Sequence, residues 1–279
     1  MWRLLRSRLR QGYQTTSVPA GPALLPAGFR GRPMLDAPKC RDGCRACVEA
    51  CPTQAITQEP LQIDLGACLF CTLCQEACPE QAIVYGTDHR LAVRTREHLL
   101  VSDSEARLAE ALDLKMRKIF GRSLKLRQVS AGGCSGCEAE LVSTGNVVFD
   151  LSRFGVQFVA SARHADGLVI TGPVTHNMER ALRETYAAVP TPKIVIAVGA
   201  CAISGGPFAG ADASGSGVPL DIPVDLYVPG CPPHPLTILD GVLRLLGRME
   251  SSAESSGPTV DLRASPQEER PGTRHRHDA

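Results

Sequence analysis

The second half of the chain alternates short apolar runs with longer stretches of helical periodicity. Continuous apolar runs of this length are typical of strands buried on both faces, and helices between such strands indicate parallel pairing through crossovers. We therefore expect a buried parallel sheet in an α/β domain that extends over residues 125–249. The apolar runs predict strands at residues 156–160, 167–171, 194–198 and 225–228.

The first third of the chain is organised by turns and by a repeat. Proline and glycine interrupt residues 13–35, which predicts an extended lead-in without regular elements before the first cysteine, Cys40. From this point the sequence duplicates itself, because CRDGCRACVEACPTQAI at 40–56 corresponds to CLFCTLCQEACPEQAI at 68–83. The duplication predicts a small domain over residues 36–90.

A linker over residues 91–124 joins the repeated region to the α/β domain. Within it, residues 102–120 carry apolar side chains at helical spacing, and they follow Ser and Asp residues that suit an N-cap. The pattern predicts a helix across this whole segment.

Residues 1–35 contain six arginines and no acidic residue. Trp2, Leu5 and Leu9 fall on one face of a predicted helix, and arginines form another stripe. Such an amphipathic segment can lie on a membrane surface, serve as an organellar transit peptide, or remain a solvated helix. The pattern alone does not separate these three alternatives.

The composition is typical of a soluble globular protein with two modest domains: 279 residues, 43% hydrophobic, 21% charged. No apolar run approaches the roughly 18 residues that a transmembrane helix needs. The net charge of +1 gives no reason to expect a nucleic-acid partner. Residues 250–279 lack aromatic side chains and have few aliphatic ones, so we expect this tail to be disordered.

Cysteine spacing carries the chemistry, because eight of the twelve cysteines lie between Cys40 and Cys78. The second half of the repeat has the C-x2-C-x2-C-x3-C-P spacing of two-cluster ferredoxins. The first half has one extra residue after Cys40, in a loop with Gly43. In such ferredoxins the fourth thiolate of each half binds the cluster of the other half. We therefore predict one 4Fe-4S cluster on Cys40, Cys44, Cys47 and Cys78, and another on Cys68, Cys71, Cys74 and Cys51.

The other four cysteines are expected to form a third site. Two of them precede a predicted helix as a C-x2-C pair, and the other two follow predicted strands. Loops at the carboxyl ends of parallel strands meet at one edge of a sheet. Four soft thiolates there favour a third 4Fe-4S cluster, with structural zinc as the alternative for all three sites. The predicted ligands are Cys134, Cys137, Cys201 and Cys231.

Two acidic residues follow the C-x2-C pair. Glu138 and Glu140 are candidates for a proton relay beside the cluster, or they are acids that stabilise a helix N-terminus. His164 and His234 are expected to support the site indirectly at most.

The first third of the chain resembles the two-cluster ferredoxin subunit of complex I and of formate hydrogenlyase-type hydrogenases. The resemblance rests on YQTTSVP at 13–19, FRGRPMLD at 29–36 and the two cysteine motifs. It implies an α+β two-cluster ferredoxin domain, and an N-terminal helix that lies against a membrane arm. This favours the membrane-surface interpretation of the arginine-rich segment.

The later part resembles the small subunit shared by complex I, where it is the 20 kDa B-type subunit, and NiFe hydrogenases. GGCSGCEAEL, SARHADGLVITGPVT, VGACAISGGPF and VPGCPPHP carry this resemblance, which implies a flavodoxin-like α/β small-subunit domain. In complex I the first two cysteine ligands are adjacent, whereas here Ser135 and Gly136 separate them, as in the hydrogenase branch. His234 stands where this family usually has arginine, so a cationic contact there would depend on pH.

Together the two resemblances imply a fused electron-transfer subunit of a membrane-associated group 4 NiFe hydrogenase or formate hydrogenlyase-like complex. Its partners would be a catalytic large subunit, membrane-arm subunits and an electron donor or acceptor protein, at the cytoplasmic face of the inner membrane. The third cluster would be proximal to the catalytic metal of the large subunit. The alternatives are a complex I-like quinone oxidoreductase subunit and a zinc-stabilised interaction or scaffold protein.

Overall fold

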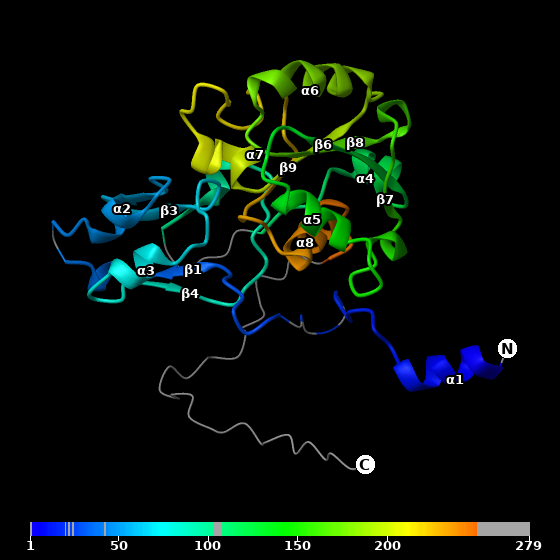
Figure 1. Ribbon diagram of the computed structural model, residues 1–279, viewed down its shortest axis with the longest axis horizontal. Helices are drawn as coiled ribbons and strands as arrows, with labels where there is room; N and C mark the ends of the chain where they lie inside the picture. The colour runs from blue at the N-terminus through cyan, green and yellow to red at the C-terminus, as the bar shows by residue number, and fades with distance from the viewer. Residues whose placement is uncertain are drawn as a thin grey trace, which may run out of the picture.

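The computed structural model describes residues 2–19, 21, 23, 25–41, 43–102 and 108–249. The predicted disordered tail, residues 250–279, lies outside the described residues. Helix α1 (Trp2–Gln11) forms where the amphipathic pattern predicts it, has no buried residue, and stands away from the rest of the chain (Figure 1). None of the described helices combines the length and the apolar composition that crossing a bilayer requires.

Within the described residues, one sheet of five parallel strands organises the C-terminal region. The strands are β6 (Leu124–Ser130), β7 (Val156–Phe158), β8 (Gly167–Thr171), β9 (Ile194–Val198) and β10 (Leu226–Val228). In space their order is β10-β9-β8-β6-β7, and each neighbouring pair is parallel. Numbered along this region, the order is the 2-1-3-4-5 arrangement of flavodoxin-like folds. The predicted fold class is confirmed.

Helices cover both faces of this sheet, because side chains alternate across each strand. Ile194 and Ile196 of β9 pack into a core with one set of helices, whereas Val195 packs into a core on the opposite face. Figure 1 shows α6 on one side of the sheet and α5 and α8 on the other. The helices are α4 (Leu114–Phe120), α5 (Gly136–Ser143), α6 (His176–Ala188), α7 (Ala200–Ser204) and α8 (Pro235–Leu245).

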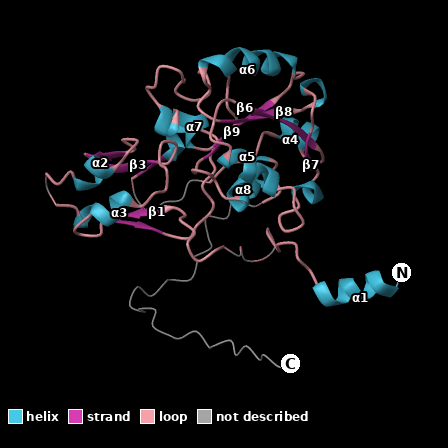
Figure 2. Cartoon of the chain, viewed as in Figure 1, coloured by secondary structure: helices cyan, strands magenta, loops and turns pink. Residues whose placement is uncertain are grey.

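The cysteine-rich region is a small α+β unit (Figure 2). Its elements are β1 (Pro33–Leu35), α2 (Ala46–Ala50), β2 (Ile56–Gln58), β3 (Leu61–Asp64), α3 (Leu73–Ala77), β4 (Ile83–Tyr85) and β5 (Leu100–Val101). Strand β1 pairs antiparallel with β4, and β3 lies between β2 and β5. The expectation of no regular element before Cys40 is wrong, because pairing with β4 makes residues 33–35 a strand. Strand pairing in this unit therefore reaches beyond residues 36–90.

The linker helix is shorter than predicted. Helix α4 begins only at Leu114, after Asp113, whose side chain accepts a hydrogen bond from the Met116 amide over 2.9 Å. Leu112 is buried instead, and its amide donates to the carbonyl of Leu245 at the end of α8. Packing against α8 therefore outweighs the helical periodicity of residues 108–113. The predicted start of the helix, residues 103–107, lies outside the described residues.

The two regions pack directly on each other. Ile203 of α7 belongs to the same core cluster as Ile63 and Leu65 of the cysteine-rich unit. The Ser204 hydroxyl donates to the carbonyl of Gly66 over 3.0 Å. A Cβ on Gly66 would lie 2.7 Å from the Ile203 side chain, so only glycine allows this close approach. The shared core fixes the second cysteine loop against the C-terminal sheet.

Candidate metal centres

The duplication in the sequence is also a duplication in backbone geometry. After each Cys-Pro turn, the third residue beyond the cysteine has a left-handed φ, 53° at Gln54 and 50° at Gln81. The following amide then donates to the cysteine sulfur over 3.2 Å, from Ala55 to Cys51 in one half and from Ala82 to Cys78 in the other. Amide donors of this kind stabilise a thiolate that binds iron.

The last cysteine of each half lies beside the thiols of the other half. Burial raises the pKa of the Cys47 thiol, and the nearby thiols of Cys40 and Cys78 add to the rise. Burial likewise raises the pKa of Cys68 to about 11, with contributions from Cys74 and Cys51. These are the neighbours that the predicted crossover requires, and half-buried Cys44 lies in the same loop as Cys47.

A small cavity is lined by Cys51 together with three thiols of the second half. The cavity residues that carry polar or sulfur atoms are Cys51, Thr53, Cys68, Cys71, Cys74 and Tyr85. The Tyr85 hydroxyl lies 3.3 Å from the Cys68 sulfur and 3.6 Å from the Cys74 sulfur. Burial and these sulfurs raise the pKa of Tyr85 far above its ordinary value. The cysteine motifs gave no indication of Tyr85. In the first half of the repeat, the position that corresponds to Tyr85 is occupied by Gln58.

The third group of thiols forms at the carboxyl edge of the parallel sheet. Cys134 and Cys137 follow β6, Cys201 lies in α7 directly after β9, and Cys231 follows β10. Burial raises the pKa of Cys137 to about 12, and the thiols of Cys201, Cys231 and Cys134 contribute. The structure therefore brings together all four cysteines that the sequence assigns to this site.

Two glycines leave the space that these thiols need. A Cβ on Gly199 would lie 2.5 Å from the Cys137 sulfur, and one on Gly206 would lie 3.1 Å from the Cys201 sulfur. Both have positive φ, 89° and 53°. The backbone thus approaches the sulfurs more closely than a residue with a side chain would allow.

The donor sets suit iron-sulfur clusters. Each group consists of four thiols, no disulfide joins any of the twelve cysteines, and thiolates are the usual ligands of such clusters. Because burial raises the pKa of several of these thiols, cluster binding must also displace their protons.

The two candidate acids differ in their surroundings. Burial alone would raise the pKa of Glu138, but hydrogen bonds from the hydroxyls of Ser130 and Thr171, each 2.6 Å long, hold it below its usual range. Ser130 and Thr171 are the last residues of β6 and β8. The strand order of the sheet reverses between these two strands. Glu140 has a pKa raised by burial and lines a pocket. Glu138 is therefore held in place by two strands, whereas Glu140 faces open space.

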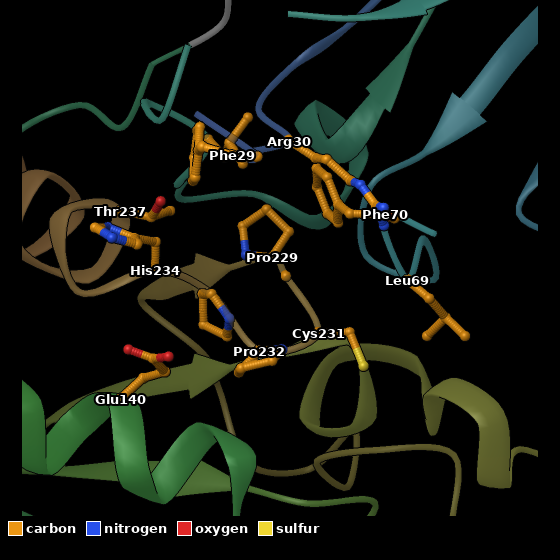
Figure 3. Close-up of a pocket in the computed structure, with 14 residues that line it drawn as sticks. Phe29, Arg30, Leu69, Phe70, Glu140, Pro229, Cys231, Pro232, His234 and Thr237 are labelled. Carbon is orange, nitrogen blue, oxygen red and sulfur yellow. The ribbon is translucent and has the colours of Figure 1, made fainter. Parts of the chain in front are cut away.

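This pocket is lined by residues of the cysteine-rich unit and of the C-terminal region (Figure 3). Leu69 and Phe70 of the cysteine-rich unit form part of its wall with Cys231 and Glu140. Burial raises the pKa of Cys231, with contributions from Cys134 and then from Cys71 in the cysteine-rich unit. Cys71 and Cys231 are thus close enough to interact electrostatically across the boundary between the two regions.

The two histidines lie at different distances from the thiols. His234 caps α8, where its Nδ1 accepts from the Leu236 amide over 3.2 Å, and its ring meets the edge of Phe29 at 5.5 Å. Burial lowers the pKa of the His234 imidazole below its ordinary value. His164 is exposed just before β8 begins, at the opposite edge of the sheet from the cysteines.

Sequence comparisons match both regions to known families. Residues 134–245 match the family described as NADH ubiquinone oxidoreductase, 20 Kd subunit, and residues 39–82 match a 4Fe-4S dicluster domain. A probable membrane-bound hydrogenase subunit, mbhJ of Pyrococcus furiosus, is 39% identical over 161 residues, which are 57% of this chain and 95% of that protein.

Relatives with other printed functions match the chain as well. Formate hydrogenlyase subunit 7 of Escherichia coli is 39% identical over 160 residues, 57% of this chain and 61% of that protein. The B-type subunit of NADH-quinone oxidoreductase from Heliobacterium modesticaldum is 44% identical over 125 residues, 44% of this chain and 71% of that protein. The chain belongs to the family of the 20 kDa subunit of NADH ubiquinone oxidoreductase, with a 4Fe-4S dicluster domain ahead of the family's own domain.

Proposed function

We propose that this chain is the electron-transfer subunit of a membrane-associated group 4 NiFe hydrogenase or formate hydrogenlyase-like complex. The observation that carries the proposal is the proximity of Cys71 and Cys231. It gives the dicluster unit a direct neighbour in the third thiol group, so electrons can pass between the two regions within one chain. The catalytic metal would be held by a separate large subunit.

The three ligand sets extend this proposal to an electron path. Outermost is the cluster on Cys40, Cys44, Cys47 and Cys78; next is the cluster on Cys51, Cys68, Cys71 and Cys74; and innermost is the cluster on Cys134, Cys137, Cys201 and Cys231. The electrostatic contribution of Cys71 to the pKa of Cys231 supports this order, because Cys71 belongs to the second of these sets. When bound, the clusters supply one-electron transfer. The protein supplies thiolates, backbone donors and the exclusion of water, which set the potentials.

Proton handling is assigned to Glu140. Its carboxyl lines the pocket beside Cys231, and burial raises its pKa, so it holds a proton more readily than a fully solvated carboxyl would. Glu138 has the opposite character, because two hydroxyl donors stabilise its charged form. Its part in the proposal is to hold the start of α5, and with it the C-x2-C loop, against β6 and β8.

A hydrogenase is favoured over a quinone reductase by the spacing of Cys134 and Cys137. Two residues separate these cysteines, and in the C-x2-C loop Ser135 adopts φ 68°. The dicluster unit uses the same geometry after Cys71, where Thr72 has φ 67°. A complex I-like subunit remains the second candidate, supported by the match to the B-type subunit of NADH-quinone oxidoreductase.

Attachment at the cytoplasmic face of the inner membrane is proposed from α1. Trp2 and Leu9 are 86% and 83% exposed on this helix, next to arginines. An exposed apolar stripe beside basic residues suits the boundary between a membrane arm and anionic headgroups.

The proposal is tested by purifying the native complex through this chain without oxygen. Three clusters predict about twelve iron and twelve sulfide per chain. A hydrogenase predicts one nickel per complex and hydrogen evolution from a reduced viologen. Full iron without nickel or hydrogen would exclude the hydrogenase and leave the quinone-type subunit. Zinc in place of iron would overturn both.

A further inference from the structure

The two halves of the dicluster unit differ at one polar position close to the thiols. Tyr85 is the seventh residue after Cys78, and the matching residue after Cys51 is Gln58. The Tyr85 hydroxyl touches the sulfurs of Cys68 and Cys74. Within the described residues, the repeat therefore places a phenol beside the second thiol group and an amide side chain at the matching position of the first half.

The Tyr85 side chain is held in position from several sides. Its strand, β4, pairs with β1, so that Tyr85 lies opposite Pro33. Its amide donates to Oε1 of Gln75 in α3 over 2.9 Å. Its ring meets the ring of Phe70 edge to face at 6.0 Å. These contacts hold the backbone and the ring of Tyr85 in place, with the hydroxyl against the Cys68 sulfur.

The direction of the hydrogen bond follows from ligation. A cysteine bound to iron is a thiolate and has no proton, so it can only accept. A phenol is protonated at neutral pH and donates. The same sulfur, Cys68, also accepts from the Phe70 amide over 3.3 Å, and Cys51 accepts from Ala55. The second thiol group thus receives a hydroxyl donor in addition to amide donors.

We propose that the Tyr85 hydroxyl donates a hydrogen bond to the Cys68 thiolate of the cluster on Cys51, Cys68, Cys71 and Cys74 and raises the reduction potential of that cluster. This inference rests on the proposed function, because it requires the clusters. Donors to thiolate sulfur stabilise the reduced cluster, which carries one more negative charge. Tyr85 is a tuning residue that acts through the ligands.

The test is the variant Tyr85→Phe in the complete complex, with each dicluster potential measured by redox titration followed by EPR. The variant keeps the ring that packs on Phe70 and removes only the donor. We expect the reduced-to-oxidised ratio of the second cluster to fall about tenfold at a fixed potential, which is about 59 mV for a one-electron couple. The first cluster should be unchanged. An unchanged second cluster overturns the proposal.

Tyr13→Phe is the matched control. Tyr13 is 90% exposed and its ring lies against Arg8, so the same loss of a hydroxyl should move neither potential. A shift in this control equal to that of Tyr85→Phe would overturn the assignment to Tyr85.

A second measurement uses the unmodified protein and does not depend on assembly of the variant. Proton ENDOR on the reduced second cluster should detect one exchangeable hydroxyl proton that disappears in deuterated water and has no counterpart at the first cluster. Its absence overturns the proposal while leaving the clusters, and hence the proposed function, intact. A chain purified without any cluster signal would instead overturn the proposed function and this inference with it.

Discussion

The two regions of this protein build four-thiol groups in different ways. The dicluster unit uses two short loops that are close in sequence, and the last cysteine of each loop lies beside thiols of the other loop. The C-terminal region gathers Cys134, Cys137, Cys201 and Cys231 from the ends of three strands of one sheet. The first arrangement depends on local loop geometry, and the second depends on a complete core. Four-thiol groups of the same composition are therefore expected to respond to different kinds of substitution in the two regions.

Loss of one cysteine ligand is expected to give the largest difference between the two regions, measured as iron bound per chain. Cys201→Ser should remove about four irons per chain and leave about eight, because the dicluster unit forms from its own loops. Cys47→Ser should remove at least four and also unfold the dicluster unit locally, since its small sheets bury little surface without the cluster. Iron analysis and EPR of the two variants check this. Loss of all iron in Cys201→Ser would contradict the independence of the two regions.

A methyl group on Gly199 tests the packing of the third site. Gly199→Ala should destabilise the protein by about 3 kcal/mol or more, because the conformation favours glycine and the new Cβ meets the Cys137 sulfur. Gly210→Ala is the control: it also has a positive φ but nothing within 4 Å, and should cost about 1–2 kcal/mol. Chemical denaturation measures both. Equal losses would show that the thiol group tolerates the methyl.

Gly66→Ala tests the contact between the two regions. The added Cβ would meet Ile203, so we expect a loss of about 1–3 kcal/mol and slower electron transfer between the second and third clusters. Ile203→Ala removes the γ2 methyl that the new Cβ would meet and should recover part of the loss in the double variant. Stopped-flow reduction kinetics measure the transfer. Additive effects would indicate that the two residues do not interact.

The two acids of α5 give the smallest expected effects. Glu138→Gln should cost about 1 kcal/mol at pH 7, since it weakens charge-assisted hydrogen bonds that solvent partly screens. The folded protein lowers the pKa of Glu138. This stabilisation is therefore fully present at a pH above the pKa of Glu138 in the unfolded chain, and it is lost as the pH falls through the pKa of Glu138 in the folded protein. Glu140→Gln should be neutral or stabilising at pH 7, because burial disfavours its charged form.

Denaturation curves between pH 3 and pH 7 compare these two variants. The difference in stability between the parent protein and Glu138→Gln should shrink toward acid pH. A difference that stays constant would mean that Glu138 does not act through its charge.

Four strands of the C-terminal sheet were predicted, and β8 and β9 are continuous apolar runs that only a doubly covered sheet can bury. Strand β6 was missed, because its sequence, LKLRQVS, mixes apolar and polar residues. The linker helix was predicted too long, because Leu112 is recruited into the core beside α8 instead of continuing the periodic pattern. Tyr85 and Phe29 were missed for a similar reason. Neither belongs to a cysteine motif, and only strand pairing and the fold of the lead-in bring them to the sites.

The sequence by itself determined the parallel α/β class of the C-terminal domain, the internal repeat and the cysteines that approach one another, since these follow from periodicity and from the spacing that a cluster imposes. Only the tertiary structure decided that Cys71 lies within electrostatic reach of Cys231, that two hydroxyls bind Glu138 while Glu140 lines a pocket, and that His234 caps α8. These features depend on which loops meet across the boundary between the two regions. That meeting is set by packing between distant residues such as Gly66 and Ile203, which local sequence patterns do not encode.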